Sequence, residues 1–242
     1  MRQIMVVYRL NGLQLRRPKG LRAIGIPRDF IFLIGPGGVG KTTTAKHLAP
    51  RLGYDHIDLD DYFCEHIENI RIFISNYGYR EYVIANARCF YEIINNCQHD
   101  TVLPLSSGFL IIEEAAEVVE ANREAVERLG TTVLLTPSHD SQKAADIVAK
   151  RQSERGLGLN EPQERQKFLS RMQVYEKFAN HIEISSGDPA NIADRIMRKI
   201  VPQSAVDGIR TGLRQIIEDQ GQDAGSFFTD LSSRHKGSIT ES

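Results

Sequence analysis

Cysteine is scarce in this chain of 242 residues, and no two cysteines have a recognisable spacing. The three are Cys64, Cys89 and Cys97, an odd number that contains no C-x-x-C pair. This pattern does not support a disulfide framework, and it is typical of free thiols in a reducing compartment. The seven histidines also lack metal-ligand spacing. We therefore expect no zinc or disulfide scaffold.

A charge excess of one sign and long apolar runs are lacking too. The net charge is −1, so no uniform basic field is available for broad nucleic-acid binding. No apolar run is long enough to span a membrane, and no secretory h-region is present. The apolar content of 41% and the charged content of 25% are ordinary for a globular protein. We expect a cytoplasmic monomer that binds neither membranes nor nucleic acid.

The chain divides into three zones. Residues 1–28 are basic and contain no acid, so we expect a flexible extension, although anion contact or organelle targeting stays open. Residues 29–202 alternate apolar strands with helical patterns, as βα units on a parallel sheet do. The pattern of residues 203–242 predicts one amphipathic helix followed by a disordered tail. The expected strands are Phe30–Ile34, His56–Leu59, Val102–Leu105, Thr132–Leu135 and His181–Ile184, with a helix over Thr42–Ala49 after the first.

The most informative motif begins at Gly35. Together with Gly40, Lys41 and Thr42 it satisfies the G-x-x-x-x-G-K-[ST] pattern of a phosphate-binding loop, between an apolar strand and a helix. Backbone N–H groups of such a loop point at one anion, the lysine reaches the β- and γ-phosphates, and the Thr42 hydroxyl holds Mg²⁺. The alternative is a glycine-rich structural turn. The motif predicts a site for ATP and Mg²⁺, with the nucleotide bound by Gly35, Gly37, Gly38, Val39, Gly40, Lys41, Thr42 and Thr43.

Two aspartates follow the second expected strand. Open α/β sheets bind ligands at the carboxyl ends of their strands, so Asp58 and Asp60 fall on the ligand edge. Asp58 would hold a water of the Mg²⁺ shell. Asp60 would orient or deprotonate the hydroxyl of an acceptor. The alternative is a polar turn in which Asp60 or Asp61 caps the next helix.

Two later segments add cationic candidates. The helical pattern before Gly156 and Gly158 suits a lid that closes over ATP. Arg155 would neutralise charge on the transferred phosphoryl group, and Arg151 would contact the nucleotide, although a solvated helix also explains Arg151. On the next helix, Arg171 would clamp a substrate carboxylate, with a surface ion pair as the alternative.

Together these motifs resemble those of the shikimate kinase family, from about Phe30 to Ile200. The resemblance includes the Ala-x-x-Leu-Ala-x-x-Leu-Gly-Tyr sequel of the loop over residues 45–54, where Pro50 is unusual. It also includes the Asp58-x-Asp60 pair, Arg155-Gly-Leu in place of the family's lid Arg-Pro-Leu, and Arg171-x-x-x-Tyr175 followed by Phe178-Ala179.

The resemblance implies an α/β P-loop NTPase fold. Its five-stranded parallel sheet would have the order 2-3-1-4-5, flanked by helices, with a lid and a small helical substrate-binding subdomain. In this family the residue matching Asp60 engages the hydroxyls of shikimate. The arginine matching Arg171 holds its carboxylate, and the lid arginine matching Arg155 contacts ATP.

The chain departs from the family pattern at the acceptor side. The family's Gly-Glu-x-x-Phe-Arg is Gly-Tyr-Arg-Glu-Tyr-Val here, so the carboxylate-binding arginine is replaced by Val83. Arg80 lies three residues earlier, close to one helical turn away, and we predict it as a substitute. The family's three glycines after the third strand become Ser106-Ser107-Gly108, of which we expect Gly108 to line the substrate site.

Three functions fit these observations. The first is an ATP- and Mg²⁺-dependent kinase that phosphorylates a hydroxyl of shikimate or a similar small hydroxy acid. The second is a kinase for another small alcohol, such as a sugar acid or an antibiotic. The third is a non-catalytic, effector-binding regulator with a shikimate-kinase-like domain, which would bind nucleotide without turnover. We favour the first, with Lys41, Asp60 and Arg155 as the catalytic residues.

Overall fold

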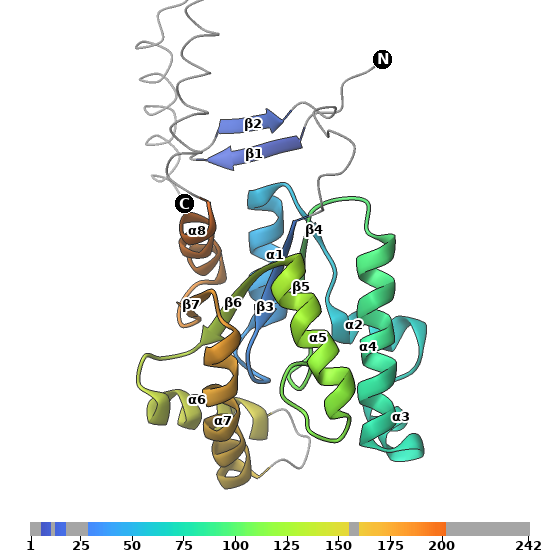
Figure 1. The fold of residues 1–242 in the computed structure, drawn as a ribbon. Coiled ribbons are helices and arrows are strands. Elements are labelled where there is room, and N and C mark those ends of the chain that lie inside the picture. The colour runs from blue at the N-terminus through green and yellow to red at the C-terminus, as the bar shows by residue number, and fades with distance from the viewer. Residues whose placement is uncertain (1–5, 11–12, 18–28, 155–159, 202–242) are drawn as a thin grey trace, which may run out of the picture. The chain divides into compact units, whose positions relative to one another are not determined.

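The computed structural model describes residues 6–10, 13–17, 29–154 and 160–201 (Figure 1). The chain falls into two units, one made of residues 1–21 and 197–242 and the other of residues 22–196. In the first unit, β1 (Val6–Leu10) and β2 (Leu13–Arg17) pair in antiparallel fashion. We did not predict these strands. The available signal was the Asn-Gly pair at 11–12 between two partly apolar runs, a sequence that favours a hairpin.

The second unit contains a five-stranded sheet whose strands are all parallel. Its order is β4-β5-β3-β6-β7, which is 2-3-1-4-5 when the strands are counted from β3, so the predicted topology is confirmed. The strands are β3 (Phe30–Ile34), β4 (Asp55–His56), β5 (Thr101–Pro104), β6 (Gly130–Thr136) and β7 (His181–Ile184).

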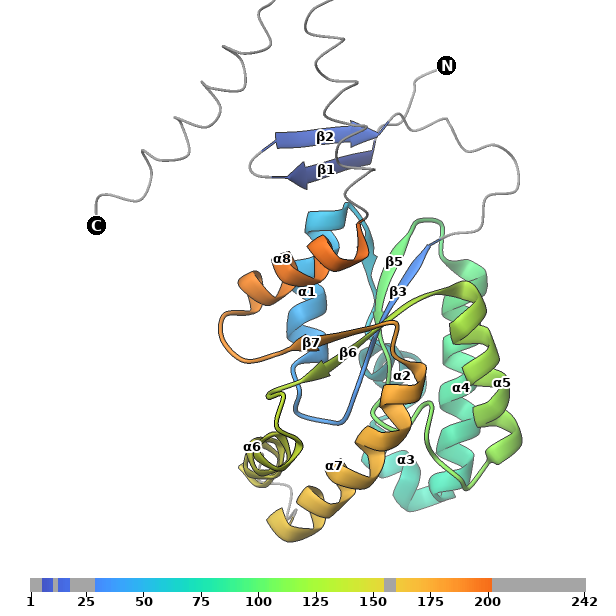
Figure 2. The same ribbon diagram turned by 60° about the vertical axis from the view of Figure 1, so that its left-hand side comes forward.

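Helices cover both faces of this sheet. Figure 2 shows α1 (Lys41–Leu52) and α8 (Pro189–Ile200) on one face, and α4 (Tyr79–Asn96) and α5 (Ala116–Leu129) on the other. This arrangement follows from the βα alternation, because each parallel crossover carries a helix over a face of the sheet. The remaining helices are α2 (Leu59–His66), α3 (Ile70–Tyr77), α6 (Ser141–Ser153), α7 (Glu161–Tyr175) and a 3₁₀ turn, Glu176–Phe178.

The central strand β3 is buried at all five positions, as expected of a strand covered on both faces. The Phe30 and Phe32 rings stack 5.7 Å apart, and Phe90 of α4 packs 6.0 Å from Phe32. This aromatic core fixes the strand that leads directly into the phosphate-binding loop, so the loop starts from a rigid support.

The bounds predicted for the second strand were wrong. We expected His56–Leu59, but β4 ends at His56 and α2 already begins at Leu59. The reason is Asp58, whose side chain accepts hydrogen bonds from the backbone N–H groups of Asp60 and Asp61 and so caps the helix. The alternative in which Asp60 or Asp61 makes the cap is wrong for the same reason.

Helix α1 is longer than the predicted Thr42–Ala49 and runs to Leu52. Pro50 stands in its last turns, where the lost backbone donor and the ring disturb few hydrogen bonds. The helix ends at Gly53, whose φ of 69° is left-handed and whose N–H bonds the Ala49 carbonyl.

The three cysteines are free thiols, as predicted. Cys89 and Cys97 are buried and Cys64 is exposed. Within the described part of the chain, no helix combines the length and the apolar character that a membrane crossing requires.

Candidate functional site

The phosphate-binding loop connects β3 to α1 at the carboxyl edge of the sheet. Gly35 has φ of 135°, and a Cβ there would lie only 2.9 Å from the Leu135 carbonyl oxygen, so the loop requires glycine at its start. The Lys41 ammonium donates to the carbonyl oxygens of Gly35 at 2.8 Å and Pro36 at 3.1 Å. It is therefore folded against the loop that would cradle the phosphates.

The other predicted nucleotide residues surround this lysine in the chain. The Val39 side chain is fully buried, so only its backbone faces a ligand. The half-buried Gly37 and Gly38 and the exposed Gly40 and Thr43 complete the loop and the first turn of α1. The loop thus presents mostly backbone, as an anion cradle does.

Thr42 and Asp58, the two residues predicted to hold magnesium, are hydrogen-bonded to each other. The Thr42 hydroxyl donates to Oδ2 of Asp58 at 2.6 Å, while Oδ1 of Asp58 caps α2. Two hard oxygen donors beside a phosphate loop fit Mg²⁺, which takes few protein ligands and keeps several waters. Among the described residues there is no group of three His, Cys, Asp or Glu that would hold a metal by itself. Water and phosphate oxygens would complete the shell.

Asp60 lies two residues after Asp58, in the first turn of α2. Its Oδ1 accepts a hydrogen bond from the Ser106 hydroxyl at 2.5 Å. Burial raises the pKa of Asp60, whereas the Ser106 bond and the nearby Lys41 ammonium oppose the rise. The predicted acceptor-handling carboxylate is therefore in electrostatic contact with the predicted phosphate-binding lysine.

Two tyrosines of α4 stand beside Asp60, and the sequence analysis missed both. Tyr82 is 7% exposed, and burial raises its pKa, as does the Asp60 charge. Burial also raises the pKa of Tyr79, and a hydrogen bond with Arg171 opposes this rise. The signal available was their spacing of three residues, which places both on one face of the helix.

Arg171 and Tyr175 both reach the loop after β5 from α7. The Tyr175 hydroxyl donates to the Ser107 carbonyl at 2.6 Å, and Nη1 of Arg171 approaches the same oxygen at 3.4 Å. The structure thus brings the predicted carboxylate-binding arginine to the segment that differs from the family's glycines.

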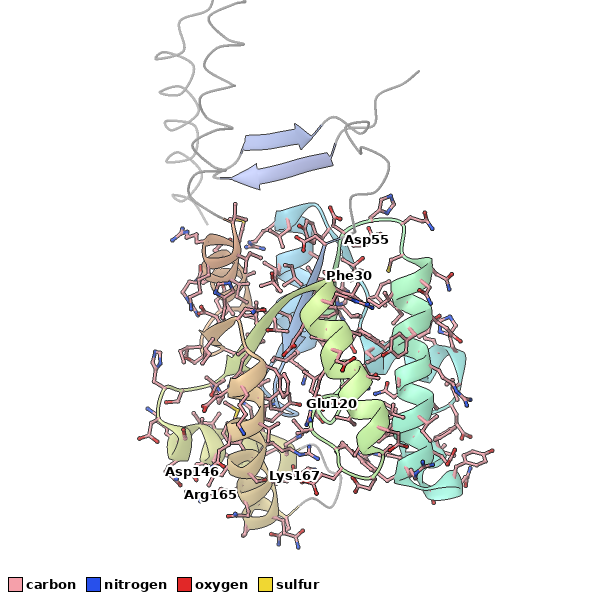
Figure 3. The ribbon with its side chains drawn as sticks, in the orientation of Figure 1. Phe30, Asp55, Glu120, Asp146, Arg165 and Lys167 are labelled. Carbon is pink, nitrogen blue, oxygen red and sulfur yellow. The ribbon has the colours of Figure 1, made fainter. Side chains whose placement is uncertain are left out.

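Helices α6 and α7 form the wall above the loop. Arg165 of α7 donates to Asp146 of α6 at 2.6 Å, and Figure 3 shows the two side chains meeting between the helices. Arg151 at the end of α6 donates to the Gly38 carbonyl at 3.2 Å, so the structure places this predicted nucleotide residue on the loop. Arg155 and the glycines that follow it lie outside the described residues.

A small depression opens between the phosphate loop, the β5 loop and helices α6 and α7, which we call the lid helices. It contains Arg171 together with three side chains that sequence analysis did not single out, Gln152, Glu164 and Lys167. Lys167 pairs with the buried Glu164 at 3.3 Å. The excess positive charge of this depression therefore comes from Arg171.

The α4 wall carries no cation at the position of the family arginine. Val83 is buried, and a second, small and largely apolar cavity lies against it, lined also by Asn86 and Gly108. Arg80 is on the surface, where it pairs with Glu117 at 3.1 Å and Glu81 at 3.5 Å. The structure places Gly108 at this cavity and Arg80 in a surface ion-pair network.

A phosphate loop after the central strand of an all-parallel sheet defines the class of P-loop NTPase folds. The chain belongs to the shikimate kinase family: the family model described as "SKI: Shikimate kinase" matches residues 37–201. This match covers Asp58 and Asp60, both lid helices and the predicted acceptor-binding residues.

Curated relatives agree with this assignment. The shikimate kinase of Psychrobacter sp. (strain PRwf-1) is 32% identical over 116 residues, which are 46% of this chain and 58% of that protein. The pentafunctional AROM polypeptide of Candida glabrata is 32% identical over 114 residues, 46% of this chain and only 7% of the polypeptide. The shikimate kinase of Enterococcus faecalis is 25% identical over 176 residues, 71% of this chain and 98% of that protein.

Solved structures show the same fold. A structure of shikimate kinase from Acinetobacter baumannii in complex with shikimate has a TM-score of 0.59 at 23% identity and covers 72% of this chain and 93% of that chain. Shikimate kinase from Bacteroides thetaiotaomicron has a TM-score of 0.58 at 20% identity, covering 71% and 98%.

Proposed function

We propose that this chain transfers a phosphoryl group from ATP to a hydroxyl of shikimate or of a similar small hydroxy acid. The observation that carries the proposal is that residues predicted to bind the nucleotide and a residue predicted to bind the acceptor lie at the same edge of the sheet. Thr42 and Asp58 are hydrogen-bonded beside the phosphate loop, and Asp60, two residues on, lies in the field of Lys41. A nucleotide site beside a carboxylate that could handle a hydroxyl suits phosphoryl transfer.

The side chains divide the work by their chemistry. Lys41 would leave the loop carbonyls to pair with phosphate oxygens, where its charge stabilises the transition state. Thr42 and Asp58 would hold Mg²⁺, which when bound neutralises charge on the phosphates. Asp60 would accept a hydrogen bond from the acceptor hydroxyl and orient its oxygen for in-line attack.

Arg171 is the predicted partner of an acceptor carboxylate. Its guanidinium faces the depression beside the loop, and the Tyr79 hydroxyl and the Ser107 carbonyl fix its direction. The lid arginines Arg151 and Arg155 are proposed to contact the nucleotide and the transferred phosphoryl group.

A kinase for a different small alcohol is the second candidate. One observation favours it: the α4 wall carries the buried Val83 and an apolar cavity instead of a second cation. An acceptor held by a single arginine needs less negative charge than one held by two.

A coupled assay of ADP release tests the proposal. The purified chain is given ATP, Mg²⁺ and, one at a time, shikimate, sugar acids and neutral polyols. We expect ADP release that depends on one acceptor, with a phosphorylated acceptor as product, and no turnover by Lys41→Ala. Nucleotide binding without acceptor-dependent ADP release would refute the proposal and support the regulatory alternative.

A further inference from the structure

One oxygen of the Asp60 carboxylate is already occupied by this chain's own side chain. The Ser106 hydroxyl, 3% exposed at the residue level, donates to Oδ1 at 2.5 Å. Ser106 is the second residue after β5, and the N–H of Leu105 between them bonds the Leu33 carbonyl of β3, which holds the start of this loop at the sheet edge. The bond therefore connects two rigid elements, β5 and α2.

The Tyr82 side chain of α4 lies beside that bond and is 7% exposed. Its phenol can donate a hydrogen bond, and a serine hydroxyl has one proton and two lone pairs. Because the single proton of Ser106 is directed at Asp60, Ser106 can only accept from Tyr82.

The Ser106 hydroxyl competes with a ligand for Oδ1 of Asp60. An ionised carboxylate accepts hydrogen bonds at both oxygens and can therefore hold two neighbouring hydroxyls of an acceptor at once. Here Oδ1 already accepts from the buried Ser106 hydroxyl, and the Ser106 side chain fills space beside it that a glycine would leave open, so a second acceptor hydroxyl would crowd Ser106 at that oxygen.

We infer that Ser106, supported by Tyr82, is a positioning residue that restricts Asp60 to a single acceptor hydroxyl, so the chain selects its substrate without requiring a vicinal diol. This inference rests on the proposed function, because it names the substrate class of the same site. The preferred acceptors are compounds whose reactive hydroxyl stands alone or whose neighbouring hydroxyl contributes nothing to binding.

The test compares two acceptors in two enzymes. The first acceptor is a vicinal diol that the parent phosphorylates, which is shikimate if shikimate is turned over. The second is an analogue of that diol that lacks the hydroxyl next to the phosphorylated one. In the parent we expect kcat/KM for the two to differ less than about threefold. In Ser106→Ala the freed oxygen can accept the second hydroxyl, so the diol should be preferred by about tenfold or more, as expected of a hydrogen bond to a charged group.

Further variants separate positioning from folding. Ser106→Gly also lacks the hydroxyl and should show the same preference if Ser106→Ala folds poorly. Tyr82→Phe should shift the preference in the same direction by a smaller factor and add nothing to Ser106→Ala. Ser170→Ala, which loses a surface hydroxyl on α7, and Tyr91→Phe on α4 are matched controls that should keep the parent ratio.

The outcomes are distinct. A parent that already prefers the diol tenfold, or a ratio unchanged in both Ser106 variants, overturns the inference and leaves the proposed function standing. A parent that phosphorylates no hydroxyl compound overturns the proposed function, and the inference with it.

Discussion

At the scale of single residues, we propose that Asp58 serves nucleotide binding and Asp60 serves the acceptor. Asp58 touches the Thr42 hydroxyl, whereas Asp60 touches Ser106 of the β5 loop. Asp60→Asn should lower kcat by about 10² or more, the scale of general-base catalysis, and leave ATP affinity unchanged. Steady-state kinetics and calorimetry measure the two quantities. A selective loss of ATP affinity would mean that the roles of Asp58 and Asp60 are exchanged.

In the proposed function, the affinity for an acidic acceptor depends on Val83, which replaces the arginine of the family pattern. A bidentate, charge-assisted contact is worth about 1.5–3 kcal/mol, so one arginine fewer should raise the acceptor KM roughly ten- to a hundredfold. We therefore expect weak shikimate turnover in the parent. Val83→Arg restores the charge at this position and should lower the shikimate KM without changing the KM for ATP.

Val83→Ala is the control, because it changes the same wall without adding a charge. Equal thermal stability of Val83→Arg and the parent would show that the buried arginine is accommodated. Tight shikimate turnover in the parent would contradict the prediction and would point to Arg80 or another residue as the replacement for the missing contact.

At the scale of elements, one ion pair connects the last strand to the last described helix. Arg195 of α8 donates to the Glu183 carboxylate of β7 at 2.5 Å and to the Ile184 carbonyl at 2.8 Å. The Glu183 side chain is only 3% exposed, whereas that of Arg195 is 42% exposed. The arginine therefore balances a buried charge from the protein surface.

Removing Arg195 should destabilise the fold. Arg195→Met leaves the buried Glu183 charge without this partner, and we expect the free energy of unfolding to fall by about 3 kcal/mol. Urea denaturation at neutral pH measures it. The double variant Glu183→Leu/Arg195→Met should recover most of the loss, because it removes the charge as well. Equal stability of the single variant and the parent would show that Arg195 contributes nothing.

Elements also show where sequence patterns are sufficient. β3 has the predicted bounds because it is an apolar run buried along its length, and β7 has them because it pairs with β6 at each of its four residues. β4 was predicted too long, since a two-residue strand carries almost no periodicity and the Asp58 cap begins the next helix immediately. Local hydrogen bonding determined that boundary.

At the scale of the whole molecule, nucleotide binding should be visible as stability. A ligand that binds only the native state at a hundred times its Kd adds about 2.7 kcal/mol, or roughly 5–10 °C for a chain of this size. Mg·ATP should raise the melting temperature of the parent by that amount and that of Lys41→Ala much less. A thermal-shift titration measures both. The same shift in the two proteins would exclude Lys41 from phosphate binding.

The phosphate loop and the βα alternation could be read from the amino-acid sequence, because both are local patterns. The order of the sheet was implied by the resemblance to the shikimate kinase family, and the structure confirms it. Thr42, Asp58 and Asp60 were predicted as site residues because ligand sites follow strand ends. The bond from Ser106 to one oxygen of Asp60 follows from tertiary packing alone. Ser106, Tyr82 and Asp60 belong to separate segments, and the distance between their side chains depends on how β5, α4 and α2 pack.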